Sequence, residues 1–483
     1  MGLLGILLGL GFLIWLSFRG WSILVLAPAA ALIAALAAGE PLLAHWTQTF
    51  MESAGVFLAQ FFPLFLLGAV FGKLMDDSGS VTTIARLMTE RLGPRRAVLA
   101  VVLAGALVTY GGVSLFVAFF VIGPMAQALF HAADIPSRLM PAAIALGTST
   151  FTMSALPGTP AIQNAIPMPF FGTTPFAAPG LGIIAALIML GFGMWWLSRA
   201  EAVARRAGEG YGDILVAPDA AADDPLVRER ATTAGAFDPA ETHRGQHSEQ
   251  GPSVLVAILP LLTVILVNLV MSMWVIPRLD TSFLAEAQWG ETPLSAVSGV
   301  WSVIAALISA ILVLVAFNYQ RLPALRATVD AGANASTLPV LSVASLVGFG
   351  AVVAAMPAFE LVRDWVLSIE GGPLVSLALS TNILSALTGS ASGGMTIALD
   401  TLGATYMQMA VELGIDPALM HRVAVIGAGT LDSLPHNGAV VTLLAVCGST
   451  HQKSYFDIVM VGIVGAMLAL VAVIVLGTMF GSF

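Results

Sequence analysis

The chain has 483 residues, of which 58% are hydrophobic and only 10% are charged. A soluble domain carries about 25% charged residues, so this composition excludes a soluble globular protein and points to lipid as the solvent. The formal net charge of -9 gives no indication of a nucleic-acid partner, and the single cysteine, Cys447, excludes a disulfide framework or a zinc motif.

Apolar segments along the chain predict an all-α polytopic membrane protein. Because lipid offers the backbone no hydrogen-bond partners, each crossing requires a helix of about 20 mainly apolar residues. The candidate crossing helices are 2–18, 22–39, 54–75, 178–199, 253–276, 294–317, 338–358 and 456–480. Two shorter stretches, 79–92 and 322–337, are predicted to be amphipathic helices at the membrane interface.

Four further apolar regions are interrupted by small or polar residues. Residues 96–131 are cut at 109–112 and residues 372–411 at 388–394 (TGSASGG), which predicts two re-entrant hairpins. Residues 137–170 and 418–447 each contain a polar stretch with Pro and Gly, which predicts two broken spans.

A polar segment divides the chain into two parts. Residues 207–251 are rich in Ala, Asp, Glu, Arg, Gly and Pro, as is typical of a solvated linker. The predicted organisation is therefore a first transmembrane repeat over 1–206, the linker 207–251, and a second repeat over 252–483.

A constant offset relates these two parts. It pairs Trp21 with Trp301 and Thr150 with Thr430, and it brings the hairpins and the broken spans into register. Each half then holds five crossings and one hairpin, and because five is odd the second half is predicted to be inverted. Inverted repeats with helices broken at the midplane are typical of secondary transporters.

Basic residues predict the orientation of the chain. With the N-terminus outside, all Lys and Arg residues except Arg278, Arg363 and Arg422 fall on one face. Basic loops stay cytoplasmic, so both termini are expected in the periplasm and the linker 207–251 in the cytoplasm of a bacterial inner membrane.

Hydroxyl, amide and glycine residues gather at the four interruptions. Helix ends there offer unpaired N–H groups, and glycine lets a ligand approach the backbone, which suits a small organic anion. The predicted substrate-binding residues are Thr109, Gly111, Gly112, Ser114, Thr150, Thr152, Ser154, Thr159, Thr388, Ser390, Ser392, Gly393, Ser433, His436 and Asn437. Gln163 and Asn164, after the first break, are further candidates. The alternative is that these small residues only permit close helix packing.

Asp432 and His436 are ionisable residues inside the apolar stretch 423–447. Such residues at membrane depth are expensive to bury and indicate function, so both are candidates for carrying a coupling proton. The alternative is that Asp432 caps a half-helix and His436 satisfies a carbonyl. No metal or cofactor motif is present, so no cofactor is expected, and the lack of a Walker A loop argues against an ATP-driven pump.

The opening 11–46, the run from Leu103 to Phe120 and the segment 147–175 resemble the gluconate permease (GntP) family of the ion-transporter superfamily. The resemblance covers nearly the whole chain outside the linker. It implies an inverted-repeat carrier, often a homodimer, that imports sugar acids or short hydroxy acids with protons. The stretch 431–441 (LDSLPHNGAVV) departs from the Asn-Asp-Ser-Gly-Phe-Trp type run of sugar-acid members and is more similar to the hydroxybutyrate-permease-like branch.

Three functions remain open on these observations. The first is proton symport of a short hydroxycarboxylate, like 3-hydroxybutyrate or gluconate, by alternating access. The second is a sodium-coupled carboxylate carrier or a sodium/proton antiporter on the same architecture. The third is a membrane enzyme or receptor, for which Ser433 and His436 form the only local nucleophile–base pair. The prediction is a transporter and not an enzyme.

Overall fold

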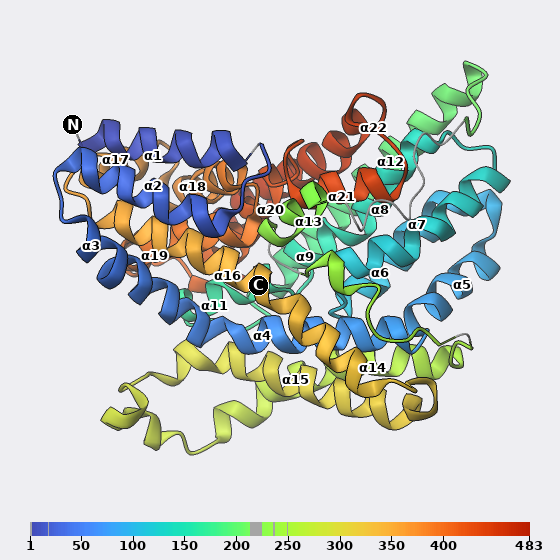
Figure 1. Cartoon of the computed structure of the whole chain (residues 1–483), viewed down its shortest axis with the longest axis horizontal. Helices are drawn as coiled ribbons and strands as arrows, with labels where there is room; N and C mark the ends of the chain where they lie inside the picture. The colour runs from blue at the N-terminus through green and yellow to red at the C-terminus, as the bar shows by residue number, and fades with distance from the viewer. Residues whose placement is uncertain (1, 18, 213–224, 235–236, 249) are drawn as a thin grey trace.

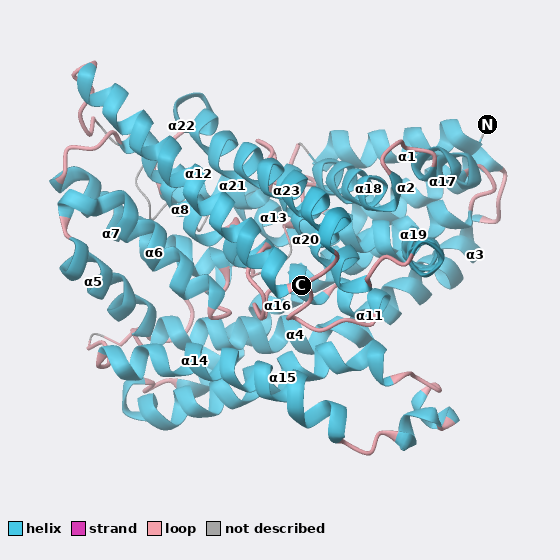
Figure 2. Ribbon diagram, turned by 180° about the vertical axis from the view of Figure 1, so that it is seen from behind, coloured by secondary structure: helices cyan, strands magenta, loops and turns pink. Residues whose placement is uncertain are grey.

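Helices form all of the regular structure in the part of the chain that the computed structural model describes, namely residues 2–17, 19–212, 225–234, 237–248 and 250–483 (Figure 2). Seven of these helices are long and apolar enough to cross a membrane. The prediction of an all-α polytopic membrane protein is therefore confirmed.

The helices before the linker follow the expected order. They are α1 (Gly2–Ser17), α2 (Ile23–Ala38), α3 (Leu42–Ala44), α4 (Met51–Asp77), α5 (Ser80–Leu92), α6 (Ala97–Tyr110), α7 (Leu115–Ala132), α8 (Met140–Thr148), α9 (Phe151–Ser154), α10 (Ile162–Ala165), α11 (Pro167–Phe171) and α12 (Pro179–Arg206). A π-helical segment joins α3 to α4, so 42–77 forms one long apolar helix. The predicted interfacial stretch 79–92 corresponds to α5, which meets the segment containing α6 at a bend of 100°.

The remaining helices lie in and after the linker. They are α13 (Pro225–Thr233), α14 (Val254–Val270), α15 (Leu294–Asn318), α16 (Leu325–Ala355), α17 (Phe359–Leu367), α18 (Gly372–Thr388), α19 (Ala391–Leu413), α20 (Pro417–Leu431), α21 (Gly438–Val446), α22 (His451–Ile458) and α23 (Gly465–Phe480). The prediction of a separate interfacial helix at 322–337 is wrong, because most of this stretch is the first part of α16. Its buried Ala331, Ala335 and Ser336 extend the apolar face of that helix.

Local chemistry sets the two hairpin turns. Gly112, with φ of +100°, ends the turn after α6, and the Ser114 hydroxyl accepts a hydrogen bond from the N–H of Phe116 at the start of α7. Gly389, with φ of +65°, ends α18, and the Ser390 hydroxyl accepts from the N–H of Gly393 at the start of α19. Glycine tolerates this left-handed backbone and serine caps the following helix, so each apolar segment folds back on itself.

The long helices α4 and α16 pack against each other through the middle of the molecule, with α14 and α15 alongside (Figure 1). A Cβ atom at Gly332 would lie 2.7 Å from Cα of Val70, so glycine is required for this close approach. The two helices come from the two parts of the chain, and the broken segments lie beside them.

The linker is partly packed against the helices, which corrects the prediction of a wholly solvated segment. Ala231 on α13 and Phe237 are fully buried, and the N–H of Asp238 donates to the carbonyl of Ala335 at 2.8 Å. Helix α13 also contacts the start of α21, where Gly438 leaves room for the carbonyl of Arg230. Composition predicted polarity correctly but could not show that a few apolar side chains anchor the segment.

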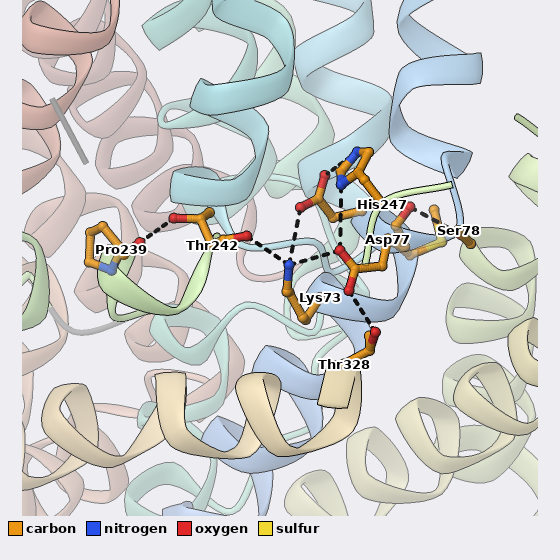
Figure 3. A network of polar contacts seen from close by, with 9 residues as sticks. Lys73, Asp77, Ser78, Pro239, Thr242, His247 and Thr328 are labelled. Atoms are coloured by element: carbon orange, nitrogen blue, oxygen red, sulfur yellow. Dashed lines mark hydrogen bonds and ion pairs between the residues drawn. The ribbon is translucent and has the colours of Figure 1, made fainter. Parts of the chain in front are cut away.

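A charged cluster fastens the end of the linker to the end of α4 (Figure 3). The buried Lys73 ammonium donates to Asp77 Oδ1 and to the Thr242 carbonyl, both at 2.8 Å, and the Thr328 hydroxyl on α16 donates to Asp77 Oδ2 at 2.6 Å. His247 lies 3.4 Å from a carboxylate oxygen of Asp76 and 3.4 Å from one of Asp77. The cluster therefore joins the linker to α4 and α16.

Candidate functional site

Two small cavities lie among the interrupted helices. The Ser114 cavity is lined by Leu64, Phe65, Gly68, Ala69, Thr109, Gly112, Val113, Ser114, Leu115, Met153, Pro160, Ala161, Ile162 and Gln163. The Asp432 cavity is lined by Leu115, Phe119, Ala145, Ser149, Met153, Ser154, Gln163, Ala391, Gly429, Asp432, Ser433, Asn437, Ala439, Val440, Leu443 and Ile458. Leu115, Met153 and Gln163 belong to both, so the two cavities adjoin.

The cavities have volumes of about 70 Å³ and 40 Å³, respectively. Ligand pockets are usually about 300–1,000 Å³, whereas one water needs roughly 10–15 Å³ by the same kind of measure. Each cavity therefore has room for a few water molecules, and a larger ligand requires the surrounding helices to move apart.

In the Ser114 cavity, the turn of the first hairpin presents small and hydroxyl groups. A Cβ atom at Gly112 would lie 2.8 Å from Cγ of Pro160, so the turn and the first break are in close contact. The Thr109 hydroxyl donates to the Gly105 carbonyl at 2.8 Å and lies 3.2 Å from the Thr152 hydroxyl. The cavity also lies at the N-terminus of α7, an 18-residue helix whose first N–H groups favour an anion.

In the Asp432 cavity, the second break presents an acid beside amide and hydroxyl groups. Asp432 is half-buried, the Ser433 hydroxyl lies 3.5 Å from its Oδ1, and Ala391 at the start of α19 lines the same cavity. Asn437 donates from Nδ2 to the Gly389 carbonyl at 2.8 Å and caps α21 through Oδ1. Asp432 thus lies where the second break meets the second hairpin, and it is the only acid among the described residues lining either cavity.

The structure places six of the fifteen residues predicted to bind substrate, together with the predicted proton-coupling residue Asp432, at the two cavities. Thr109, Gly112 and Ser114 line the Ser114 cavity, and the Asp432 cavity is lined by Ser154, Ser433, Asn437 and Asp432. These residues come from the first hairpin and from both breaks, so the site draws on segments more than 300 residues apart.

The other predicted residues from the first part of the chain lie outside the cavities. Gly111 faces Leu261 on α14, and the hydroxyls of Thr150 and Thr152 donate to backbone carbonyls of α8. Thr159 is buried, and its hydroxyl accepts from the N–H of Ala161. The three threonine hydroxyls therefore bond to the backbone of the broken span and do not line the cavities.

The residues predicted to bind substrate in the second hairpin, and His436, also line neither cavity. Thr388 lines an apolar cavity against α1, while Ser390, Ser392 and Gly393 are buried within the hairpin. His436 Nε2 lies 3.0 Å from the Ala386 carbonyl, so the side chain contacts the hairpin. From the second hairpin, Ala391 alone reaches the Asp432 cavity among the described residues.

Arg422 was predicted on the outer face with Arg278 and Arg363, but it lies fully buried on α20. Its guanidinium donates to the Ala177 carbonyl at 2.7 Å and lies 3.4 Å from both the Ser154 carbonyl and Asn164 Oδ1. The neighbouring His421 is within 3.2 Å of Asn164 Oδ1. Assigning basic residues to the loops on either face could not predict that this arginine is buried. The signal in the sequence was its position five residues after Pro417, inside an apolar helix.

Acidic and histidine side chains close enough to share a metal ion occur in one place within the described chain, at Asp76, Asp77 and His247. The Lys73 ammonium lies 2.8 Å from Asp77 and supplies positive charge there, so the arrangement is that of an ion-pair cluster. His247 lies outside the crossing helices, and its hydrogen bond with Asp77 and the nearby Asp76 charge raise the pKa of its imidazole above 6.5.

A cavity of about 560 Å³ lies beside this cluster and not at the breaks. It is bounded by α5, α7 and the linker residues Thr242, His243 and His247, and we call it the linker cavity. This cavity lies against the linker, whereas the two smaller cavities lie where the backbone is broken. Broken backbone inside a membrane is tolerated where it is buried or lines a cavity, so the smaller pair is the better candidate site.

Comparisons with known proteins find a matching family and similar chains. The profile described as GntP family permease matches residues 1–176, which include the first hairpin and the first break. An uncharacterized transporter, YxjC, from Bacillus subtilis strain 168 is 38% identical over 482 residues, covering 98% of each chain. A high-affinity gluconate transporter of Escherichia coli K12 is 30% identical over 171 residues, covering 34% of this chain and 37% of that protein.

Proposed function

Because the chain belongs to the GntP permease family, it is a membrane transporter and not an enzyme, and we propose that it imports a short hydroxycarboxylate by proton symport. The substrate class is gluconate-like or 3-hydroxybutyrate-like. The gluconate transporter among its relatives supports a sugar acid, whereas the stretch 431–441 favours a shorter monocarboxylate.

One observation carries this proposal: the two adjoining cavities place a helix N-terminus and hydroxyl groups on one side and a single acid on the other. The start of α7 suits a carboxylate, and Ser154, Ser433 and Asn437 offer partners for substrate hydroxyls. An ionised Asp432 would repel an anionic substrate nearby. Binding of the anion therefore favours a proton on Asp432, which would couple the two movements.

The surrounding architecture supports alternating access as the transport step. In this proposal, 1–206 and 252–483 act as inverted repeats, both termini face the periplasm, and the linker faces the cytoplasm of a bacterial inner membrane. The small volume of both cavities supports a cycle in which the walls separate to admit substrate. A homodimer and a role for His436 in the proton pathway remain part of the proposal.

Uptake into proteoliposomes tests the proposal. Labelled 3-hydroxybutyrate and gluconate are supplied separately under an imposed proton gradient without sodium. Accumulation of either that collapses with a protonophore supports proton symport and selects the substrate branch. Accumulation that requires sodium, or proton release driven by sodium with no organic substrate, would instead favour the sodium-coupled alternatives.

Substitution of Asp432 separates coupling from binding. We expect Asp432→Asn to abolish gradient-driven accumulation while exchange of substrate across the membrane continues, because the amide cannot carry the proton. Asp400→Asn is the matched control, since Asp400 lies on α19, is exposed and lines neither cavity. Normal accumulation by Asp432→Asn would contradict the coupling role.

A further inference from the structure

Gln163 lies where the two cavities of the candidate site meet, and its side chain is almost fully buried, with 7% exposed. Its Oε1 atom is buried without a hydrogen-bond partner among the described residues. Several other buried polar atoms also lack partners, but of those residues only Gln163 lines either cavity.

The side-chain amide of the neighbouring Asn164 makes several hydrogen bonds, so an unpaired amide is not a general feature of this segment. Asn164 donates from Nδ2 to the carbonyls of Thr159 and Pro175, both at 3.0 Å, and its Oδ1 faces His421 and Arg422. Asn164 therefore holds the break together, whereas Gln163 lines both cavities and its Oε1 has no partner among the described residues. The adjacent side-chain amides of Gln163 and Asn164 therefore have different roles.

A buried amide oxygen without a partner is unfavourable unless a ligand or water supplies one. The amide of glutamine accepts at Oε1 and donates from Nε2, so it pairs well with an alcohol, which also donates and accepts. The position of Gln163, between the start of α7 and Asp432, places it beside the middle of any substrate that spans both cavities.

We propose that Gln163 binds a substrate hydroxyl near the carboxylate and thereby selects hydroxycarboxylates over carboxylates that lack this group. Oε1 accepts the hydroxyl hydrogen, and Nε2 donates to the hydroxyl oxygen or to the carboxylate. An analogue without the hydroxyl leaves the buried amide unpaired, which is the strongest basis for rejecting it. This inference rests on the proposed function and adds to it a residue that determines specificity.

The test measures competition for binding to the purified full-length protein. Unlabelled 3-hydroxybutyrate or gluconate competes with its labelled form, and butyrate or hexanoate serves as the matching acid without hydroxyls. We expect wild type to prefer the hydroxy acid by about 100-fold or more. Gln163→Leu should lose most of this preference by weakening hydroxy-acid binding while butyrate or hexanoate binding changes little.

Gln127→Leu is the matched control, because it also removes an amide, on α7, but lies outside both cavities. We expect it to keep the wild-type preference. Gln163→Glu is a second, nearly isosteric variant for the case in which the leucine variant fails to fold. Its added charge should weaken binding of both acids, since it would face their carboxylates.

The outcomes separate this inference from the function on which it rests. Wild type that binds a hydroxy acid, with Gln163→Leu keeping the full preference or weakening both acids equally, would overturn the role of Gln163 and leave the proposed function standing. If Gln163→Glu binds both acids as well as wild type does, the role of Gln163 is likewise overturned and the proposed function still stands. Wild type that binds none of the probes would overturn both.

Discussion

The two helical hairpins have similar turns but different surroundings. In the first, Thr109, Gly112 and Ser114 line the Ser114 cavity at the start of α7. In the second, the hydroxyls of Thr388, Ser390 and Ser392 are buried within the hairpin, and Asn437 and His436 contact its carbonyls at Gly389 and Ala386. The first turn is therefore available to a ligand, whereas the second is fastened to the broken span beside it.

This contrast teaches that composition does not reveal which turn faces a ligand. Glycine and serine serve both turns because both need a left-handed residue and a helix cap. The two turns differ in the residues of distant segments that contact them. In the second hairpin, Ala391 at the start of α19 lines the cavity that contains Asp432, so an acid of the protein lies near this helix start.

The strongest test of the contrast exchanges glycine for alanine in each turn. Gly112→Ala should lower uptake by about 10-fold or more, because a left-handed residue other than glycine costs about 1–2 kcal/mol and the new Cβ would lie 2.8 Å from the Pro160 ring. Gly389→Ala carries a similar backbone cost, but its Cβ would lie 3.1 Å from His436. We expect it to reduce thermal stability and to change substrate affinity little.

Initial uptake rates per folded transporter, together with melting temperatures of both purified variants, measure this difference. Equal loss of substrate affinity in the two variants would show that both turns contact the substrate and would remove the contrast.

A smaller effect is expected when the hydrogen bond between Asn437 of the second broken span and the second hairpin is removed. Asn437→Ala removes the bond to the Gly389 carbonyl and the cap of α21, so stability should fall by about 1–3 kcal/mol. Denaturant unfolding monitored by tryptophan fluorescence checks the size of the loss. Asn437→Asp restores the cap of α21 but not the hydrogen bond to the Gly389 carbonyl, so it should recover part of the stability. If Asn437→Ala is as stable as wild type, Asn437 does not hold the second hairpin in place.

The smallest expected effect concerns the end of α4, where pH changes the contacts between His247 of the linker and Asp76 and Asp77. His247 lines the linker cavity with Arg86 and His243 and faces Lys73, Asp76 and Asp77. Because the pKa of His247 is raised in the docked state, its contribution is fully present below pH 6.5 and is lost as pH rises through the raised pKa. The protection of 242–248 against hydrogen exchange, corrected for the intrinsic rise of exchange rates with pH, should therefore fall as pH rises above 6.5.

His247→Ala should abolish this pH dependence and leave fast exchange at all pH values. His243→Ala is the control, since His243 lines the same cavity but is not one of the ion-pair partners of Asp76 or Asp77. Unchanged protection in His247→Ala would show that Lys73 alone holds the segment.

The sequence predicted the helices and their interruptions well because both depend on local chemistry. Apolar runs predicted the helices, although those at 2–17 and 23–38 are shorter than the seven that are long enough to cross a membrane. Gly112, Gly389 and Ser390 stand at the observed turns. The packing of Phe237 against the helices and the burial of Arg422 could not be predicted, because they depend on partners far away in the chain. For the same reason, the sequence identified Thr109, Ser154 and Asp432 as candidates but could not separate them from Ser392 or Thr150.

The contacts of Arg422 have a consequence for the order in which the chain enters the membrane. The oxygen atoms that surround its guanidinium come from Ser154, Asn164 and Ala177, all of which are synthesised well before α20. A newly inserted α20 therefore meets an acceptor site that already exists, which lowers the cost of bringing an arginine into lipid. The second part of the chain, produced alone, would lack these acceptors, so its biogenesis depends on the first part having arrived.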